Sequence, residues 1–257
     1  MSDRYLVRVA IAPLHSEPRA AAEQVSQRVR GHVVMLLEEH APWLRVRGAD
    51  GYEGWIHSGY LQPLTAALEM RFEGARHSLG CTVRDAHGHR LALPLGALLA
   101  GDDVVEKGSV IAASELRTRF PATPASITCA AVELFESTPY QWGGITPWGA
   151  DCSGLVQTVF GLHGISMPRD ARDQANVARE VGDAIGDARP ADLLFFSDRP
   201  DRRITHVAIA LDGMRAVHLA IGRGGYAVEQ LDAHDDPYVS ALVGRFLYLR
   251  RPELSAR

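Results

Sequence analysis

Apolar residues recur at helical spacing near the middle of the chain. The run starts after Asp151, a residue type that caps helix N-termini, and glycines at 161 and 164 close it. Before the run, residues 138–149 are dense in glycine, proline and aromatic side chains, which is typical of turns and loops. The pattern therefore predicts a helix that begins at about Cys152. Its apolar positions are Leu155, Val156, Val159, Phe160 and Leu162.

Short strand-like segments dominate the N-terminal part of the chain. Apolar stretches at 5–10, 33–37, 43–47 and 54–57 are separated by turn residues, which favours a small β-barrel. Residues 78–84 and 91–96 flank a turn at 85–89 and predict a hairpin of a second, more divergent barrel. Residues 121–124 are typical of a linker, and residues 126–136 predict the first helix of a third domain.

Another predicted hairpin carries one histidine on each arm. Residues 205–210 and 215–219 have the pattern of strands, and a turn signal, Asp-Gly at 212–213, lies between them. If the loop has an odd number of residues, His206 and His218 lie on the same face, directly opposite or diagonal to each other. An even number of loop residues would place them on opposite faces.

Cys152 and the histidine hairpin together indicate nucleophilic catalysis. The thiolate is the reactive form of cysteine, a free thiol titrates near ~8.5, and backbone N–H groups at a helix start favour the anion. On a shared face, one imidazole takes the thiol proton and the other holds the first in the right tautomer. The candidate triad is therefore Cys152, His206 and His218. The alternative for Cys152 is a small, buried and inert side chain.

The motifs around these residues resemble the NlpC-type cysteine peptidases of bacterial cell-wall peptides. They are Pro-Tyr-x-Trp-Gly-Gly at 139–144, Asp-Cys-Ser-Gly-Leu-Val-Gln at 151–157, Met-Pro-Arg-Asp at 167–170, Gln174, Asp-Leu-Leu-Phe-Phe at 192–196 and the two histidines. The resemblance covers about residues 125–250. It implies an α+β fold, a reduced papain-like domain whose helices pack on an antiparallel sheet. It also implies that Cys152 is the nucleophile, His206 the base and His218 the residue that orients the base.

The N-terminal segments resemble bacterial SH3-type domains. Residues 1–63 resemble one such domain, residues 64–121 resemble a second and more divergent one, and residues 122–257 are then the peptidase domain. This order resembles the intracellular enzymes of murein-peptide recycling, which hydrolyse γ-D-glutamyl bonds to a diamino acid. The resemblance implies a hydrolase for small murein peptides with a free N-terminal L-alanine. It also implies that the first SH3-type domain lines and blocks one end of the cleft.

Several positions match family residues that contact the substrate. Asp151, Ser153 and Asp170 match positions that contact the L-Ala-γ-D-Glu part of the substrate, although they also suit helix caps. Tyr140 is placed to donate to the developing oxyanion beside the backbone N–H of Cys152. We expect Trp142 to pack as a wall of the cleft.

The sequence leaves alternatives for the partner of Arg169 and for the residues that bind the substrate's ammonium. Arg169 pairs with a carboxylate, which is either that of the substrate or one near Asp170. For the substrate's free ammonium, the resemblance points to Glu23 and Tyr52 of the first barrel, with Tyr60 as a rival. The alternative is that Glu23 is a solvated loop carboxylate and that Tyr52 packs in the barrel.

Two positions depart from the family pattern. Ala171 stands where relatives often have a serine, which affects fine specificity rather than the reaction. Ala191 stands before Asp192 where glycine is usual, which predicts a less tight turn.

Composition narrows the function classes. A chain of 257 residues with a net charge of −4 and 46% hydrophobic residues is long enough for more than one core, and nothing in it indicates nucleic-acid binding. No stretch approaches the ~20 apolar residues of a membrane span, and charged residues interrupt the start, so neither a membrane segment nor a signal peptide is expected. Cys81, Cys129 and Cys152 are far apart and lack metal-ligand spacing, which favours the cytoplasm and predicts no metal or other cofactor.

Three alternative functions remain at this point. Asp151, Cys152 and the two histidines could gather around zinc. The SH3-type domains could hold wall fragments beside an inactive peptidase. The same fold could also transfer the acyl group to an amine instead of water. The sequence determines neither the oligomeric state nor the preferred diamino acid.

Overall fold

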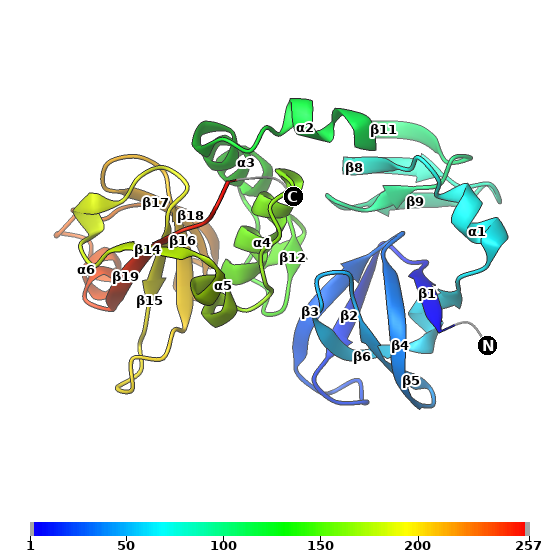
Figure 1. Ribbon diagram of the computed structural model, residues 1–257, viewed down its shortest axis with the longest axis horizontal. Coiled ribbons are helices and arrows are strands. Elements are labelled where there is room, and N and C mark those ends of the chain that lie inside the picture. Colours follow the sequence, from blue (N-terminus) through cyan, green and yellow to red (C-terminus); the bar gives the residue numbers. More distant parts are fainter. Residues whose placement is uncertain (1–2, 255–257) are drawn as a thin grey trace. The chain divides into compact units, whose positions relative to one another are not determined.

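The computed structural model describes residues 3–254, and the chain forms two compact units (Figure 1). The first unit covers residues 1–116 and the second covers residues 117–257. No helix among residues 3–254 is long and apolar enough to cross a membrane.

The first unit begins with a seven-stranded antiparallel sheet in the order β3-β2-β6-β5-β4-β1-β7. Its inward-facing apolar residues form one core, which includes Leu14, Val46 and Ile56. The strand β3 was not predicted, because it buries the polar residues Ser26 and Gln27 instead of following an apolar alternation. The strands are β1 (Arg4–Val7), β2 (Ile11–His15), β3 (Gln24–Val29), β4 (Val33–His40), β5 (Trp43–Arg47), β6 (Glu53–His57) and β7 (Leu61–Pro63).

A helix and a second sheet complete the first unit. The predicted hairpin is present, because β8 pairs with β9 around a turn at residues 85–89. Val29 of the first sheet packs in the same core as Val83 and Leu93, so the two sheets share buried surface. The elements are α1 (Ala66–Arg71), β8 (Arg76–Arg84), β9 (Arg90–Leu93), β10 (Leu98–Leu99) and β11 (Val104–Ala112), followed at the unit boundary by α2 (Leu116–Arg119).

The second unit is built on a six-stranded antiparallel sheet in the order β14-β19-β15-β16-β17-β18. Its strands are β14 (Arg179–Gly182), β15 (Leu193–Phe196), β16 (His206–Ala210), β17 (Arg215–Ala220), β18 (Gly225–Gln230) and β19 (Phe246–Arg251). The helices are α3 (Pro124–Phe135), α4 (Cys152–Leu162), α5 (Ala171–Val177) and α6 (Pro237–Val243), and a small pair of strands is β12 (Ile145–Thr146) with β13 (Gly149–Ala150).

Helices cover both faces of the sheet in this unit (Figure 1). On one face, Leu242 of α6 packs with Leu194 and Phe196 of the central strand β15. On the other face, α4 contacts β16 and β17 as well as α3. This explains why β15 is a continuous apolar run, and it places the start of α4 against the histidine hairpin.

The turn before β15 keeps the left-handed conformation that glycine usually adopts. Ala191 has φ 69°, and its N–H donates to Ala210 O at 2.9 Å. Asp192 accepts from the backbone of Arg189 at 2.8 Å and pairs with Arg251 at 2.7 and 2.8 Å. The prediction of a less tight turn is therefore wrong, because these contacts hold Ala191 in place against a conformational cost of about 1–2 kcal/mol.

Candidate active site

Cys152 is the first residue of α4, as the sequence predicts. Asp151 caps the helix, and its Oδ1 accepts from the backbone N–H of Gly154 at 2.8 Å. The N–H of Cys152 belongs to the first turn, where backbone donors have no acceptor within the helix. That N–H is therefore available to an oxyanion formed beside the sulfur.

Burial dominates the electrostatics of the Cys152 thiol. The residue is 8% exposed. Burial, and then the charge of Asp151, raises the pKa of Cys152 to about 12, against opposing contributions from Arg169 and from backbone hydrogen bonds of Val207 and Ser153. The backbone N–H groups favour the anion, as the sequence indicates, but desolvation outweighs them. The hydrogen bond with Val207 places the sulfur beside β16, one residue from His206.

His206 and His218 lie on the same face of the sheet. Ile209 pairs with Val217 and Ala210 with Ala216, a register that makes the two histidines diagonal neighbours across β16 and β17. Nε2 of His206 lies 2.8 Å from Nδ1 of His218. The loop between the two strands therefore has an odd number of residues, which is the first of the two alternatives that the sequence allowed.

A buried carboxylate lies behind His218. Nε2 of His218 lies 3.3 Å from Oε1 of Glu229 on β18, and Arg223 donates to the two carboxylate oxygens of Glu229 at 2.7 and 2.9 Å. Arg223 also donates to Asp236 at 2.5 Å. Burial alone would raise the pKa of Glu229, but hydrogen bonds from His218 and Arg223 outweigh it and lower that pKa to about 2. Glu229 is therefore ionised at neutral pH.

The charge of Glu229 fixes the tautomers of both histidines. An ionised carboxylate can only accept, so a singly protonated His218 carries its proton on Nε2, toward Glu229, and accepts through Nδ1. His206 must then donate to it through Nε2. This leaves Nδ1 of His206 unprotonated, and this nitrogen is the base of the site.

Both reactive groups are neutral before substrate binds. Burial, with the neighbouring His218 adding to it, lowers the pKa of His206 to about 3. Because the pKa of Cys152 is raised, the resting pair at neutral pH is a thiol and a neutral imidazole. The arrangement is suited to moving the proton from sulfur to nitrogen as the sulfur attacks.

Asp151, Ser153 and Arg169 form a buried ionic cluster with one another. Arg169 donates to the two oxygens of Asp151 at 3.0 and 2.6 Å and to Oγ of Ser153 at 2.8 Å. Ser153 donates to Asp151 at 3.2 Å, and Asp151 also accepts from the N–H of Gly143 at 2.8 Å. The sequence left two candidate partners for Arg169, a carboxylate of the substrate or one near Asp170. The partner in the structure is Asp151, the cap of α4. The cluster joins the loop before α4 to the helix start.

The other predicted residues of this unit, Tyr140, Trp142 and Asp170, differ in how far they are buried. Tyr140 is half-buried, and its pKa is raised first by burial and then by the charges of Cys152 and Asp151, so its phenol remains protonated beside the sulfur. Trp142 is 57% exposed. Asp170 is exposed and takes the cap position of α5, where no hydrogen bond from its side chain caps the helix.

Glu23 and Tyr52 belong to the other unit of the chain. Glu23 is exposed immediately before β3, and Tyr52 is half-buried immediately before β6. The rival Tyr60 is partly buried against the core of the first sheet. Their role toward the substrate stays a prediction.

The geometry does not assemble a metal site. Among residues 3–254, no three His, Cys, Asp or Glu side chains are grouped as metal ligands. Cys81, Cys129 and Cys152 are all free cysteines.

Comparison with known proteins finds two family models that match parts of the chain. Residues 137–241 match the model of the NlpC/P60 family, and residues 12–62 match that of the bacterial SH3 domain. The chain thus has an NlpC/P60 domain and one bacterial SH3 domain. The region matched by the NlpC/P60 model contains all three residues of the candidate triad. The second SH3-type domain that the sequence analysis places at residues 64–121 stays a prediction.

Relatives extend over most of the chain. A dipeptidyl-peptidase 6 from Lysinibacillus sphaericus is 26% identical over 91% of this chain and 93% of its own length. A γ-D-glutamyl-L-lysine dipeptidyl-peptidase from Bacillus subtilis is 26% identical over 75% of this chain and 71% of its own length. The crystal structure of an NlpC/P60 family protein from Bacillus cereus has the same fold, with a TM-score of 0.78 at 16% identity over 96% of this chain and 99% of that one.

Sequence reasoning missed two residues of the NlpC/P60 domain, Glu229 and Arg223. The signal in the sequence was weak, because Glu229 reaches His218 only if β18 pairs with β17 in the observed register. In that register His218 is opposite Ala227, and Glu229 is its diagonal neighbour on the same face. Gln174, which was noted only as part of the motif, is fully buried and donates to Ser153 O at 2.9 Å and to Pro168 O at 2.8 Å. It ties the start of α4 to the segment that carries Arg169.

Proposed function

We propose that this protein hydrolyses the γ-D-glutamyl bond to the diamino acid in small murein peptides that have a free N-terminal L-alanine. The observation that carries the proposal is the hydrogen bond of 2.8 Å between His206 and His218, which lie on β16 and β17, the two strands that α4, the helix beginning at Cys152, contacts. The names of three relatives that match most of the chain support the choice of bond. Two are named γ-D-glutamyl-L-lysine dipeptidyl-peptidase and the third is named dipeptidyl-peptidase 6.

The reaction begins with proton transfer from Cys152 to Nδ1 of His206. The sulfur attacks the γ-carbonyl carbon of the D-glutamyl residue, and His206, now an imidazolium, protonates the amine of the departing diamino acid. The C–N bond breaks and a thioester remains on Cys152. His206 then takes a proton from water, whose oxygen attacks the thioester and releases L-Ala-γ-D-Glu.

His218 and Glu229 act on this reaction through His206. When His206 becomes positively charged, its Nε2–H still donates to His218, which in turn donates to the ionised Glu229. The carboxylate thus stabilises the imidazolium through one intervening ring. The backbone N–H of Cys152 and the phenol of Tyr140 supply donors for the oxyanion.

Under this proposal, substrate recognition depends on residues near Cys152 and on the residues that the resemblance implies for the free ammonium. Trp142 and Asp170 are the exposed candidates within the NlpC/P60 domain. Asp151, Ser153 and Arg169 hold the helix start through their buried hydrogen bonds and ion pair, and under this proposal the cluster borders the L-Ala-γ-D-Glu part of the substrate. Glu23 and Tyr52 bind the free ammonium of L-alanine, and the absence of a hydroxyl at Ala171 alters fine specificity.

The reaction belongs to murein-peptide recycling in the cytoplasm under this proposal. A peptide with a free N-terminal L-alanine is a product of wall breakdown rather than intact wall. The free cysteines, of which Cys129 is exposed, suit a reducing compartment.

Product analysis by mass spectrometry tests the proposal. The substrates are L-Ala-γ-D-Glu-diaminopimelate, its L-lysine counterpart and both peptides N-acetylated on alanine. Release of the free diamino acid from the unblocked peptides alone, lost in Cys152→Ala, is the expected result. Equal cleavage of blocked and unblocked peptides would refute the requirement for the free amine, and no cleavage of any would refute the substrate. Transfer to an added amine in preference to water would instead identify an acyl transferase.

A further inference from the structure

A cavity of about 320 Å³ lies within the first unit. None of its lining residues belongs to the candidate triad. Three segments line it: the first sheet, helix α1 with Phe72, and the turn between β8 and β9. Its charged and titratable lining residues are Arg8, Arg30, Arg71, Asp85, His87 and His89. Its size falls within the range of pockets that hold small molecules.

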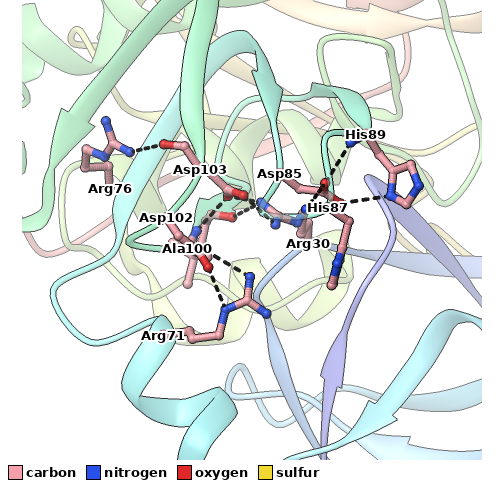
Figure 2. A network of polar contacts seen from close by, with 10 residues as sticks. Arg30, Arg71, Arg76, Asp85, His87, His89, Ala100, Asp102 and Asp103 are labelled. Atoms are coloured by element: carbon pink, nitrogen blue, oxygen red, sulfur yellow. Dashed lines mark hydrogen bonds and ion pairs between the residues drawn. The ribbon is translucent and has the colours of Figure 1, made fainter.

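The guanidinium groups of Arg30 and Arg71 are fixed by carboxylates behind them. Figure 2 shows Arg30 paired with Asp103 and Arg71 paired with Asp102. Arg30 is 6% exposed, donates to Asp103 through both terminal nitrogens, and lies 5.7 Å from the centroid of the Phe72 ring. Arg71 donates to Asp102 at 3.1 and 3.0 Å. Ligand binding would therefore not have to order these side chains.

The hydrogen-bonding capacity that the arginines leave in the cavity consists of donors. Arg8 uses only Nε, in a bond of 3.0 Å to Gly59 O, and Arg71 uses only Nε and Nη2. Within residues 3–254, the terminal nitrogens of Arg8, Nη1 of Arg71 and the ring of His87 have no hydrogen-bond acceptor in the protein.

The single carboxylate of the lining has its oxygens engaged. Oδ1 of Asp85 accepts from the backbone N–H groups of His87 at 2.9 Å and His89 at 2.8 Å, and Oδ2 faces Nδ1 of His89 at 3.3 Å (Figure 2). These bonds overcome desolvation and lower the pKa of Asp85. A ligand that fits the remaining groups therefore presents acceptors rather than donors.

Charge and apolar surface are both present in the lining. Three arginines line the cavity against one carboxylate, while the carboxylates of Asp102 and Asp103 lie behind Arg71 and Arg30 and are not part of the lining. Phe72 and Leu91 add apolar contact surface next to these cations. The combination suits an anionic head group attached to a hydrocarbon or ring.

We propose that this cavity of the first unit binds a small organic anion, through a carboxylate or phosphate group held by Arg8 and Arg71 and an apolar part held against Phe72 and Leu91. The site is separate from the NlpC/P60 domain and does not depend on the reaction proposed for it. Arg30 is the buried arginine of the lining, and His87 and His89 are its exposed histidines.

The test is an NMR titration of the ¹⁵N-labelled full-length protein. The probes are phenyl phosphate and 3-phenylpropionate, with inorganic phosphate and the uncharged 3-phenylpropanamide for comparison. We expect saturable shifts confined to amides near residues 8, 71–72 and 85–91, with at least about tenfold tighter binding of an aryl anion than of the amide. The stronger of the two aryl anions identifies the preferred head group.

Matched variants separate this site from general attraction of anions. Arg8→Gln combined with Arg71→Gln should weaken binding at least about tenfold, whereas Arg45→Gln, an exposed arginine of β5 outside the cavity, should leave it unchanged. An unchanged melting temperature shows that the double variant is folded. His87→Asn provides a second test of the cavity at an exposed position, where the substitution does not disturb the fold, and should also weaken binding. Absence of saturable shifts, equal binding of the uncharged amide, or equal binding by the double variant would overturn the proposal.

Discussion

Nε2 of His218 lies 3.3 Å from Oε1 of Glu229, and both side chains are enclosed, with exposed fractions of 1% and 6%. Because Glu229 is ionised, this contact sets the direction of the hydrogen bonds from Glu229 through His218 to His206. The carboxylate therefore determines which nitrogen of His206 is the base, although it does not contact the substrate.

Removing the carboxylate of Glu229 should reduce activity without abolishing it. Glu229→Ala frees His218 to take the other tautomer, so we expect kcat to fall about 10–100-fold, the usual effect of losing such a supporting residue, with little change in KM. Glu229→Gln, which keeps an acceptor, should be less affected. The exposed carboxylate Glu180 provides the control, since Glu180→Ala should behave as wild type. Activity of Glu229→Ala within twofold of wild type would exclude this role.

The pH profile should lack the acid limb of an ordinary histidine. The pKa of His206 is lowered to about 3, and the base must be unprotonated to act. The reactive form is therefore lost only as pH falls toward that value, well below the ordinary pKa near ~6.5. We expect kcat/KM measured between pH 5 and 8 to show no decrease attributable to His206. A limb centred near pH 6.5 that disappears with the histidine would contradict this account.

The ion pair of Asp151 and Arg169 should be needed for stability. Both side chains are buried, with exposed fractions of 6% and 2%, so Arg169→Met leaves the charge of Asp151 without its partner. We expect the free energy of unfolding to fall by about 3–5 kcal/mol in denaturant titrations. Arg172→Met, at an exposed position of α5, is the control. Combining Arg169→Met with Asp151→Asn should recover part of the loss, and a loss below about 1 kcal/mol in the single variant would refute the argument.

Ala191 offers a stabilising substitution. Its φ of 69° is costly for alanine and free of strain for glycine, whereas glycine gains more chain entropy on unfolding. The balance predicts that Ala191→Gly raises the free energy of unfolding by about 0.5–1 kcal/mol. Ala188→Gly, at a residue with φ −64°, should instead be neutral or destabilising. A lower melting temperature for Ala191→Gly would show that the turn is not strained.

The local features of the site were predictable from the sequence. The start of α4 follows from Asp151 and the apolar spacing after it, and the histidine hairpin follows from two strand patterns around an Asp-Gly turn. The choice between one or two faces for His206 and His218 required only the loop length. Each of these depends on residues close together in the chain.

Features that depend on distant contacts were not predictable. The place of Glu229 behind His218 requires the register of a third strand, and the partner of Arg169 lies 18 residues earlier in the chain. The raised pKa of Cys152 was not predictable, because the helix start is visible in the sequence whereas the burial of the thiol is not. β3 was missed because its buried residues are polar.

The rate of diamino acid release by Cys152→Ala and Cys129→Ala tests the central claim most directly. Both variants lose one free cysteine, but Cys129 is exposed on α3 and takes no part in the proposed reaction. With L-Ala-γ-D-Glu-diaminopimelate or its lysine counterpart as substrate, the account predicts wild-type kcat/KM for Cys129→Ala and no detectable release by a folded Cys152→Ala. Release by Cys152→Ala at a rate near that of the wild type would contradict the assignment of Cys152 as the nucleophile.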